Sequence, residues 1–305
     1  MAATAAAADY PVTVESCGQP LSFEAAPERV VVHDLNMIEM FFTLGLQERM
    51  VGVTGITGWY KVDAGFSAQL GDIPELAPKY PSLENLLAVS PDFFFAGWYY
   101  GMRPGGEVTP DTLAPFGVKT LVLTENCVHL DESVPDATMA LLFDDIRKLR
   151  RIFAKEAEAE ALLAGWQAEL TAIGEKIGDR QRKRVFLYDS GEDQPFTAGR
   201  FAIPTAMIAA AGGENVLSDF DTSWGRTSWE TVAARNPEFL ILLDYQDDAG
   251  YRKLLDFLKA HPAMRETDAV KNERFVALRY AELTPGPANI AAIRKIAAAM
   301  HGLVY

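Results

Sequence analysis

A motif that carries a carboxylate occurs once in each half of the chain. Ser82-Leu-Glu84 and Ser228-Trp-Glu230 each begin a short helix-like segment, which is followed by a proline-bounded turn and an apolar strand. The serine can cap the helix, and the glutamate then lies in the first turn, beside the positive end of the helix dipole. The repeat therefore predicts two similar α/β lobes, each of which displays one carboxylate.

Aromatic and arginine side chains gather in loops that follow predicted strands. Aromatic faces suit flat or polycyclic ligands and cations, whereas arginines complement carboxylates or phosphates, although such aromatics can equally pack a loop down. We expect ligand contacts from the following residues: Trp59, Tyr60, Trp98, Tyr99, Tyr100, Arg103, Arg200, Trp224, Arg226 and Tyr245. Further candidates lie at other strand ends: Asp34, Asn36, Asp189 and Tyr280.

The sequence gives no catalytic signature. It has no GxSxG elbow, P-loop, HExxH, or GxGxxG after a strand, and its four histidines show no spacing of three or four residues. We expect no catalytic residue, no metal site and no cofactor. A redox or metal enzyme with a cofactor between the lobes stays an alternative, favoured if Cys17 and Cys127 are free thiols. An adhesin-like protein without a deep cleft is a third.

The elements that must position these residues alternate between strand and helix. This alternation predicts Rossmann-like lobes with mainly parallel sheets, where ligands bind beyond the carboxyl ends of the strands. We expect an N-terminal lobe over residues 10–135 and a C-terminal lobe over 179–305, with the ligand cleft between them. Residues 136–178 lack proline and place apolar residues at helical spacing, which predicts one long helix of roughly 60 Å joining the lobes.

Composition and charge narrow the functional class. The 305-residue chain has a formal net charge of −14, which argues against nucleic-acid binding, and it has no long apolar run typical of a membrane span. Residues 1–9 resemble the small-residue end of a secretory signal, so we expect an exported protein; a cytosolic protein with an Ala-rich terminus is the alternative. In an exported chain, Cys17 and Cys127 would form one disulfide, which closes a loop of about 110 residues.

These features resemble periplasmic binding proteins of ABC importers for iron siderophores, haem or vitamin B12. The resemblance is carried by the segments Leu83–Asp92 and Trp229–Glu238, the long helix and the aromatic loops. It implies that Glu84 and Glu230 dock onto arginines of the permease, and that a periplasmic monomer delivers a metal chelate, contacting the membrane only through the permease or a lipid anchor. A ferric siderophore is the expected ligand, with cobalamin or haem as alternatives.

Overall fold

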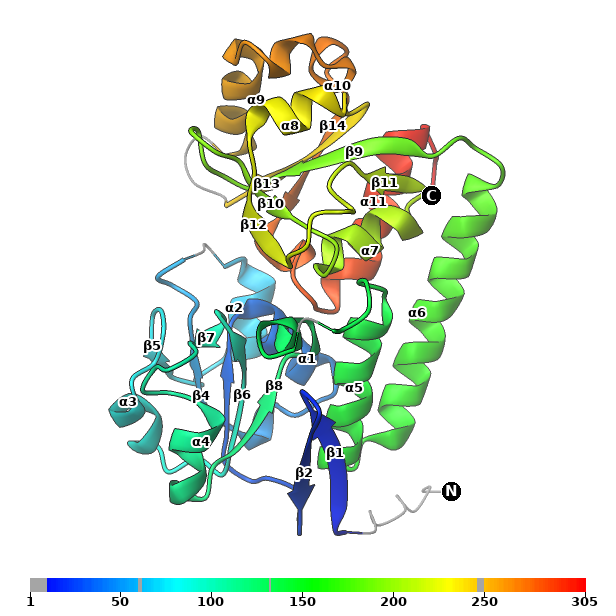
Figure 1. Ribbon diagram of the computed structural model, residues 1–305. Helices are drawn as coiled ribbons and strands as arrows, with labels where there is room; N and C mark the ends of the chain where they lie inside the picture. The colour runs from blue at the N-terminus through cyan, green and yellow to red at the C-terminus, as the bar shows by residue number, and fades with distance from the viewer. Residues whose placement is uncertain (1–9, 60–61, 132, 246–249) are drawn as a thin grey trace. The chain divides into compact units, whose positions relative to one another are not determined.

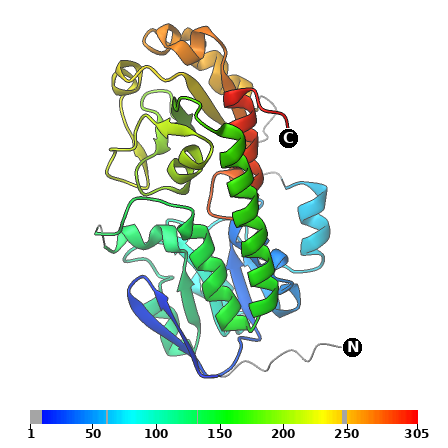
Figure 2. The ribbon, with the colours of Figure 1, turned by 90° about the vertical axis from the view of Figure 1, so that its right-hand side faces the viewer.

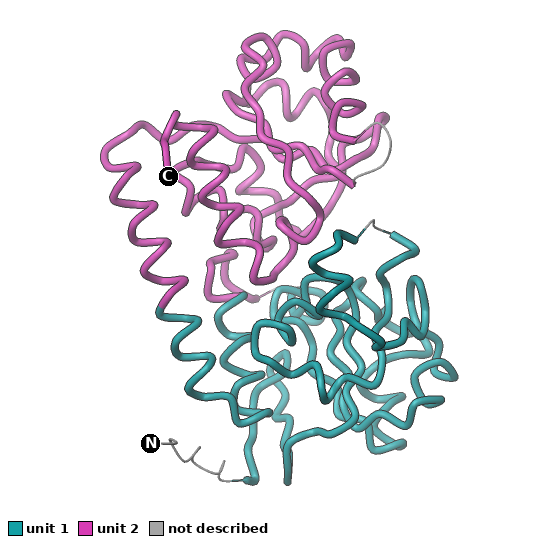
Figure 3. The backbone as a smooth tube through the Cα atoms, turned by 180° about the vertical axis from the view of Figure 1, so that it is seen from behind, with its two compact units in different colours: residues 1–131, 142–164 teal, residues 132–141, 165–305 magenta. Residues whose placement is uncertain are grey.

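The chain folds into two compact α/β units. The computed structural model describes residues 10–59, 62–131, 133–245 and 250–305, so Tyr60 and the predicted signal remnant at 1–9 lie outside the described residues. Unit 1 comprises residues 1–131 and 142–164, and unit 2 comprises residues 132–141 and 165–305 (Figure 3). The prediction of a mixed α/β fold with mainly parallel sheets is confirmed.

Unit 1 is built on a parallel sheet (Figure 1). The central strands of this sheet are apolar and buried on both faces. The sheet has the order β5-β4-β3-β6, with β7 and β8 both paired to β6. Its strands are β3 (Val30–His33), β4 (Met50–Thr54), β5 (Glu75–Ala77), β6 (Phe93–Trp98), β7 (Gly101–Met102) and β8 (Lys119–Val122).

The helices that precede residue 131 in unit 1 are short and begin at polar caps. Asp34, Asp63, Ser82 and Thr109 each accept a backbone N–H at the start of a helix. These helices are α1 (Leu35–Thr43), α2 (Ala64–Leu70), α3 (Leu83–Leu87) and α4 (Pro110–Leu113), and the 3₁₀ segments are Gln47–Arg49, Ala114–Phe116 and Thr124–His129.

An antiparallel hairpin lies along the edge of this sheet at β8. It consists of β1 (Val12–Ser16) and β2 (Gln19–Phe23), and the Ser16 hydroxyl oxygen accepts the backbone N–H of Val122 at 3.0 Å. A disulfide between Cys17 and Cys127 joins the hairpin to the segment after β8, as the sequence predicts for an exported chain. Both cysteines are therefore bonded, so the free thiols that would have favoured the redox-enzyme alternative are not present.

The stretch predicted as one long helix contains two. The long helix is α6 (Glu156–Ile177), and α5 (Ala140–Phe153) precedes it; α5 and the first half of α6 lie side by side and antiparallel (Figures 1 and 2). Ala154 adopts a φ of 55°, and the N–H of Lys155 bonds the carbonyl of Arg150, an ending typical of a Schellman motif. The apolar spacing continues across this break, so periodicity alone could not reveal the reversal.

Unit 2 repeats the architecture with four parallel strands in the order β11-β9-β13-β14. Its sheet consists of β9 (Lys183–Tyr188), β11 (Gly213–Asn215), β13 (Phe239–Asp244) and β14 (Phe275–Arg279), and a separate antiparallel pair consists of β10 (Phe196–Ala198) and β12 (Trp224–Arg226). Alternate residues of β13 face opposite sides: Ile241 and Leu243 join one core cluster, whereas Leu240 and Leu242 join the other.

Helices cover both faces of the unit 2 sheet. The first cluster contains residues of α7 and α11, and the second contains residues of α8, α9 and α10. These helices are α7 (Ile203–Ala210), α8 (Trp229–Ala234), α9 (Tyr251–Ala260), α10 (Asp268–Lys271) and α11 (Ala288–His301), and the 3₁₀ segments are Met264–Glu266 and Tyr280–Glu282. Among the described residues, no helix combines the length and apolarity that crossing a membrane requires.

Candidate functional site

The carboxyl ends of β3 and β4 in unit 1 meet at a buried histidine. His33 is 2% exposed, and its Nδ1 lies 2.8 Å from the hydroxyl of Thr54. Burial lowers the pKa of His33 to about 3, so the ring is neutral at pH 7. A Cβ at Gly55 or Gly101 would lie within 2.6 Å of this ring, so both glycines make room for it. The buried His33 ring forms a wall against which Tyr80 packs.

Tyr80 packs on that wall and organises an aromatic face. Its ring centroid lies 5.8 Å from His33 and 6.4 Å from Trp59, and its hydroxyl donates to the carbonyl of Tyr99 at 2.5 Å. The Arg103 guanidinium lies 4.7 Å from the Tyr80 ring centroid. Burial raises the pKa of Tyr80, although Arg103 opposes this. Sequence reasoning missed Tyr80; the only signal is its place between two prolines, before the first repeat.

Two exposed rings complete this face. Trp59 is 44% exposed with the Lys79 ammonium 4.2 Å from its ring centroid, and Tyr99 is 54% exposed with its ring centroid 4.8 Å from that of His129. Exposed aromatic rings with two cations close by offer a surface that suits a ligand with a flat or polycyclic, negatively charged body. We call Trp59, Lys79, Tyr80, Tyr99 and Arg103 the unit 1 face.

Trp98 does not join the unit 1 face. Residues alternate along β6, so Phe93 and Phe95 pack towards Phe41 of α1, while Phe94 and Trp98 belong to the core cluster on the opposite side. The indole is buried, and Tyr99 then reverses the chain with a φ of 64°. Trp98, Tyr99 and Tyr100, which the sequence analysis treated as one cluster, thus divide between the core and the surface; Tyr100 is half-buried beside the tight turn that begins at Gly97.

In unit 2 the carboxyl end of β9 presents a buried carboxylate. Asp189 is 5% exposed and accepts hydrogen bonds from the Ser190 hydroxyl at 2.5 Å and the Tyr245 hydroxyl at 3.0 Å. Burial raises the pKa of Asp189 to about 6, even though these bonds and nearby Arg226 lower it. Tyr245 also stacks with Tyr280, with ring centroids 6.3 Å apart.

Trp224 and Arg226 lie together on β12. Trp224 stacks on Phe196 of β10 at 5.9 Å, and the Arg226 guanidinium lies 5.7 Å from the same ring. Phe196 was not identified from the sequence. Arg200 interacts with other residues instead: it forms ion pairs with Asp136 at 2.8 Å and with Asp221 at 3.3 Å. We call Asp189, Phe196, Trp224, Arg226 and Tyr245 the unit 2 face.

The remaining sequence candidates are buried. Asp34 caps α1 through the N–H of Leu35 at 2.7 Å, and Asn36 is fully buried in the first turn of that helix. Among the described residues, no group of three or more His, Cys, Asp or Glu side chains is arranged to hold a metal ion.

The two repeated glutamates occupy equivalent places. Glu84 lies in the first turn of α3 after the cap Ser82, and Glu230 lies in the first turn of α8 after the cap Ser228. Both glutamates are exposed, and neither carboxylate takes part in an ion pair with any residue that the structure describes. Each carboxylate is therefore available to a cation on a partner.

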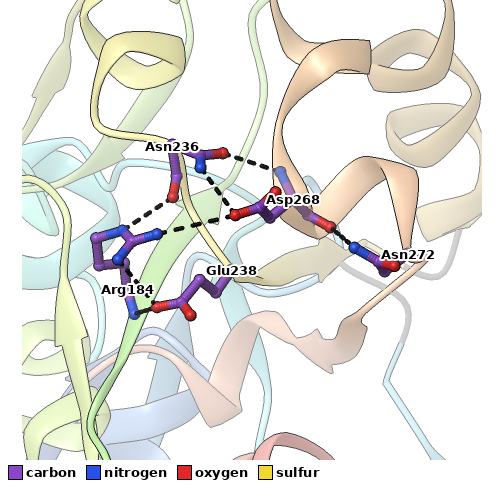
Figure 4. Close-up of polar contacts among 5 residues, drawn as sticks. All are labelled: Arg184, Asn236, Glu238, Asp268 and Asn272. Atoms are coloured by element: carbon purple, nitrogen blue, oxygen red, sulfur yellow. Dashed lines mark hydrogen bonds and ion pairs between the residues drawn. The ribbon is translucent and has the colours of Figure 1, made fainter.

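The turn after each of these helices is fixed to its sheet by an arginine. In unit 2, Arg184 donates through Nε to the carbonyl of Asn236 at 3.0 Å and pairs with Glu238 at 3.3 Å (Figure 4). The Asn236 amide reaches Asp268 at 2.8 Å, and Asn272 donates to the Asp268 carbonyl at 2.7 Å. This network positions the end of α8, and with it the helix that carries the glutamate.

The chain matches known proteins over most of its length. A family model for periplasmic binding proteins matches residues 30–281. The vitamin B12-binding protein of Salmonella typhimurium is 26% identical over 223 residues, which cover 73% of this chain and 74% of that protein.

Solved structures share the fold over nearly the whole length. A periplasmic binding protein from Veillonella parvula is 29% identical with a TM-score of 0.84, covering 96% of this chain and 98% of that one. An ABC-type Fe³⁺-hydroxamate transport system protein from Saccharomonospora viridis is 21% identical with a TM-score of 0.81, covering 95% and 99%. With most of its length matched by the family model, this chain belongs to the periplasmic binding protein family.

Proposed function

We propose that this protein is the exported substrate-binding component of an ABC importer and that it captures an anionic metal chelate, in the first instance a ferric siderophore. The observation that carries the ligand class is the unit 1 face, where Lys79 and Arg103 lie against the rings of Trp59 and Tyr80. Cations placed on aromatic rings leave a surface that is both apolar and positive. A chelate with a broad organic shell and negative charge matches that surface.

The unit 2 face supports the same assignment. Arg226 lies over Phe196, beside Trp224, and offers a second cation on an aromatic surface. The named function of the Salmonella relative favours cobalamin as a second candidate. Haem is a third, because the exposed Tyr99 could ligate its iron. No catalytic step is part of the proposal; recognition and presentation to the permease suffice.

Binding tests separate these ligands. Intrinsic fluorescence quenching should show saturable binding of a ferric tris-catecholate, which is anionic, at micromolar concentration, tighter than haem or cyanocobalamin. Tyr99→Ala should weaken binding about tenfold, because one exposed ring supplies much of the contact area. Phe116→Ala is the matched control, since Phe116 is also an exposed ring of unit 1, at 56%, but lies outside the unit 1 face. Absence of binding by every compound would refute the ligand class.

Charge variants test the ligand's sign. Arg103→Gln and Arg226→Gln should each weaken an anionic chelate several-fold and leave cyanocobalamin, which has no net charge, almost unaffected. Equal losses for both ligands would contradict the choice of an anionic chelate.

A transport assay tests docking. Glu84→Arg or Glu230→Arg should reduce chelate uptake through the cognate permease at least about tenfold, while chelate affinity stays unchanged, because reversed charge repels an arginine on the partner. Glu24→Arg in unit 1 and Glu214→Arg in unit 2 are matched controls, since both glutamates are exposed but lie outside α3 and α8. Unchanged uptake in both tip variants would refute the docking role.

A further inference from the structure

The turn between β6 and β7 carries Tyr99 in a strained backbone conformation. Tyr99 has a φ of 64°, in the left-handed region that is unfavourable for a residue with a Cβ. Gly97 and Tyr100 exchange two backbone hydrogen bonds across the turn, and the N–H of Tyr99 bonds the carbonyl of Met102 at 2.8 Å. Because the Tyr99 ring is 54% exposed, its own packing gives little support, and other contacts must hold the turn in this conformation.

Tyr80 supplies one such contact from a segment that lies 19 positions earlier in the chain. Its hydroxyl donates to the carbonyl of Tyr99 at 2.5 Å, at the tip of the turn. The chain just before Tyr80 is itself fixed, because the carbonyls of Ala77 and Pro78 each accept a backbone N–H from the loop after β4 at 2.9 Å. The hydrogen bond therefore joins the turn to a segment that is already attached to another part of unit 1.

The Tyr80 ring is held independently of its hydroxyl. The ring centroid lies 5.8 Å from that of His33 and 4.7 Å from the Arg103 guanidinium carbon. A phenylalanine at this position would keep both ring contacts and would lose only the hydrogen bond to the turn. The substitution Tyr80→Phe therefore tests the hydroxyl alone.

We infer that Tyr80 is a positioning residue of the proposed ligand site: its hydroxyl holds the β6–β7 turn and so keeps the Tyr99 ring where a chelate can pack on it. Tyr80 then acts on affinity through Tyr99, because its hydroxyl proton is already donated within the protein. The effect on binding rests on the proposed function, whereas the coupling between the two tyrosines exists without a ligand.

A double-mutant cycle with a ferric tris-catecholate tests the effect on binding. Tyr80→Phe should weaken the chelate about three- to fivefold, which is within the range that one hydrogen bond supplies. Combined with Tyr99→Ala, it should cause no further loss, because the ring that it positions is already absent. Tyr10→Phe is the matched control and should leave affinity unchanged, since the Tyr10 hydroxyl also donates to a carbonyl in unit 1, that of Ile152 at 2.7 Å, but lies outside the unit 1 face.

Two results of this cycle would overturn the inference. Losses that multiply in Tyr80→Phe/Tyr99→Ala would show that the Tyr80 hydroxyl acts independently of Tyr99. A loss that persists in the presence of Tyr99→Ala but disappears in the presence of Arg103→Gln would show that the hydroxyl acts through the guanidinium instead.

A measurement without ligand keeps the inference separate from the proposed function. The Tyr99 ring lies against His129, with ring centroids 4.8 Å apart, and partial desolvation lowers the pKa of His129. In the ligand-free protein, NMR titration should show the His129 pKa rising towards its ordinary value in Tyr80→Phe, as in Tyr99→Ala, but not in Tyr10→Phe. A His129 pKa that is the same in Tyr80→Phe as in the native protein would refute the inference. Failure of the chelate to bind would refute the proposed ligand class, and the titration would still decide the coupling.

Discussion

The turn after α3 in unit 1 and the turn after α8 in unit 2 are held by the same device. Arg29 precedes β3 and donates to the carbonyls of Val89 and Ser90, at 2.6 and 2.9 Å, just as Arg184, the second residue of β9, donates to the carbonyl of Asn236. Asp92 accepts the backbone N–H of Arg29 at 2.9 Å, as Glu238 accepts that of Arg184 at 3.0 Å. The repeat therefore includes the arginine as well as the glutamate.

The two units differ in what reinforces this device. In unit 2 the left-handed residue of the turn, Asn236, uses its side chain to hold Asp268 of α10, whereas in unit 1 the equivalent Ser90 makes no such bond to any second helix that the structure describes. Unit 1 instead carries the Cys17–Cys127 bond beside its sheet. A short helix cannot fix its own orientation, so each unit attaches the glutamate-bearing helix to its sheet and adds a different reinforcement.

The largest expected effect comes from removing the reinforcement that only unit 1 has. Cys17→Ala/Cys127→Ala opens a loop with a sequence separation of 110 residues, which in the chain-entropy model lowers the free energy of unfolding by about 4–5 kcal/mol. Hydrogen exchange measured segment by segment should show lost protection in β3, β6 and β8, with β9 and β13 unchanged. Equal losses of protection in both sheets would contradict the claim that the disulfide stabilises unit 1 alone.

A smaller effect distinguishes the two arginines. Arg29→Met removes the side-chain bonds to the turn after α3 and should cost about 1–2 kcal/mol of local stability, with faster exchange around Ser90. Arg184→Met should cost less, because the bonds between Asn236 and Asp268 remain and still hold the turn. Exchange rates of the two turns in each variant measure the difference. A larger loss in Arg184→Met would show that the Asn236 network is not the reinforcement.

The smallest effect depends on pH and involves one buried carboxyl in each unit. Burial raises the pKa of Asp145 in α5 and of Asp189 after β9 from 3.8 to about 6. Because the folded state then holds the proton more tightly than the unfolded state, the stabilisation is complete below about pH 4 and is lost as pH rises through about 6. As the pH falls from 7 to 5, protonation of each carboxyl should raise the free energy of unfolding by about 1 kcal/mol.

Asparagine variants separate the two groups. Asp145→Asn should remove the pH dependence of the protection factors around Thr124, whose N–H and hydroxyl bond Asp145 at 3.1 and 2.5 Å, and leave that of the β9 protection factors intact. Asp189→Asn should remove the pH dependence of the protection factors in β9 and leave that around Thr124 intact. A pH dependence that survives in its own unit after the substitution would assign it to another group.

The strands and the repeat could be predicted from the sequence. Whether a given side chain faces the core or the solvent could not always be predicted. The apolar runs at Val30–His33 and Phe239–Leu243 predict buried parallel strands, because burial on both faces requires them to be apolar. The continuous apolar pattern around Ala154 hid the end of α5, since both antiparallel helices bury their apolar faces. Tyr80 escaped notice because nothing local distinguishes a proline-flanked tyrosine that packs on His33 from one that faces solvent.

By itself the sequence determined two α/β lobes, the paired carboxylates at helix starts and the family resemblance, because caps, prolines and periodicity act through neighbouring residues. Only the tertiary structure decided that Trp98 belongs to the core and Tyr99 to the surface, and that Arg29 and Arg184 hold the two turns. Those outcomes depend on contacts between residues about 50 or more positions apart, whose pairing is fixed only when the strands assemble into sheets.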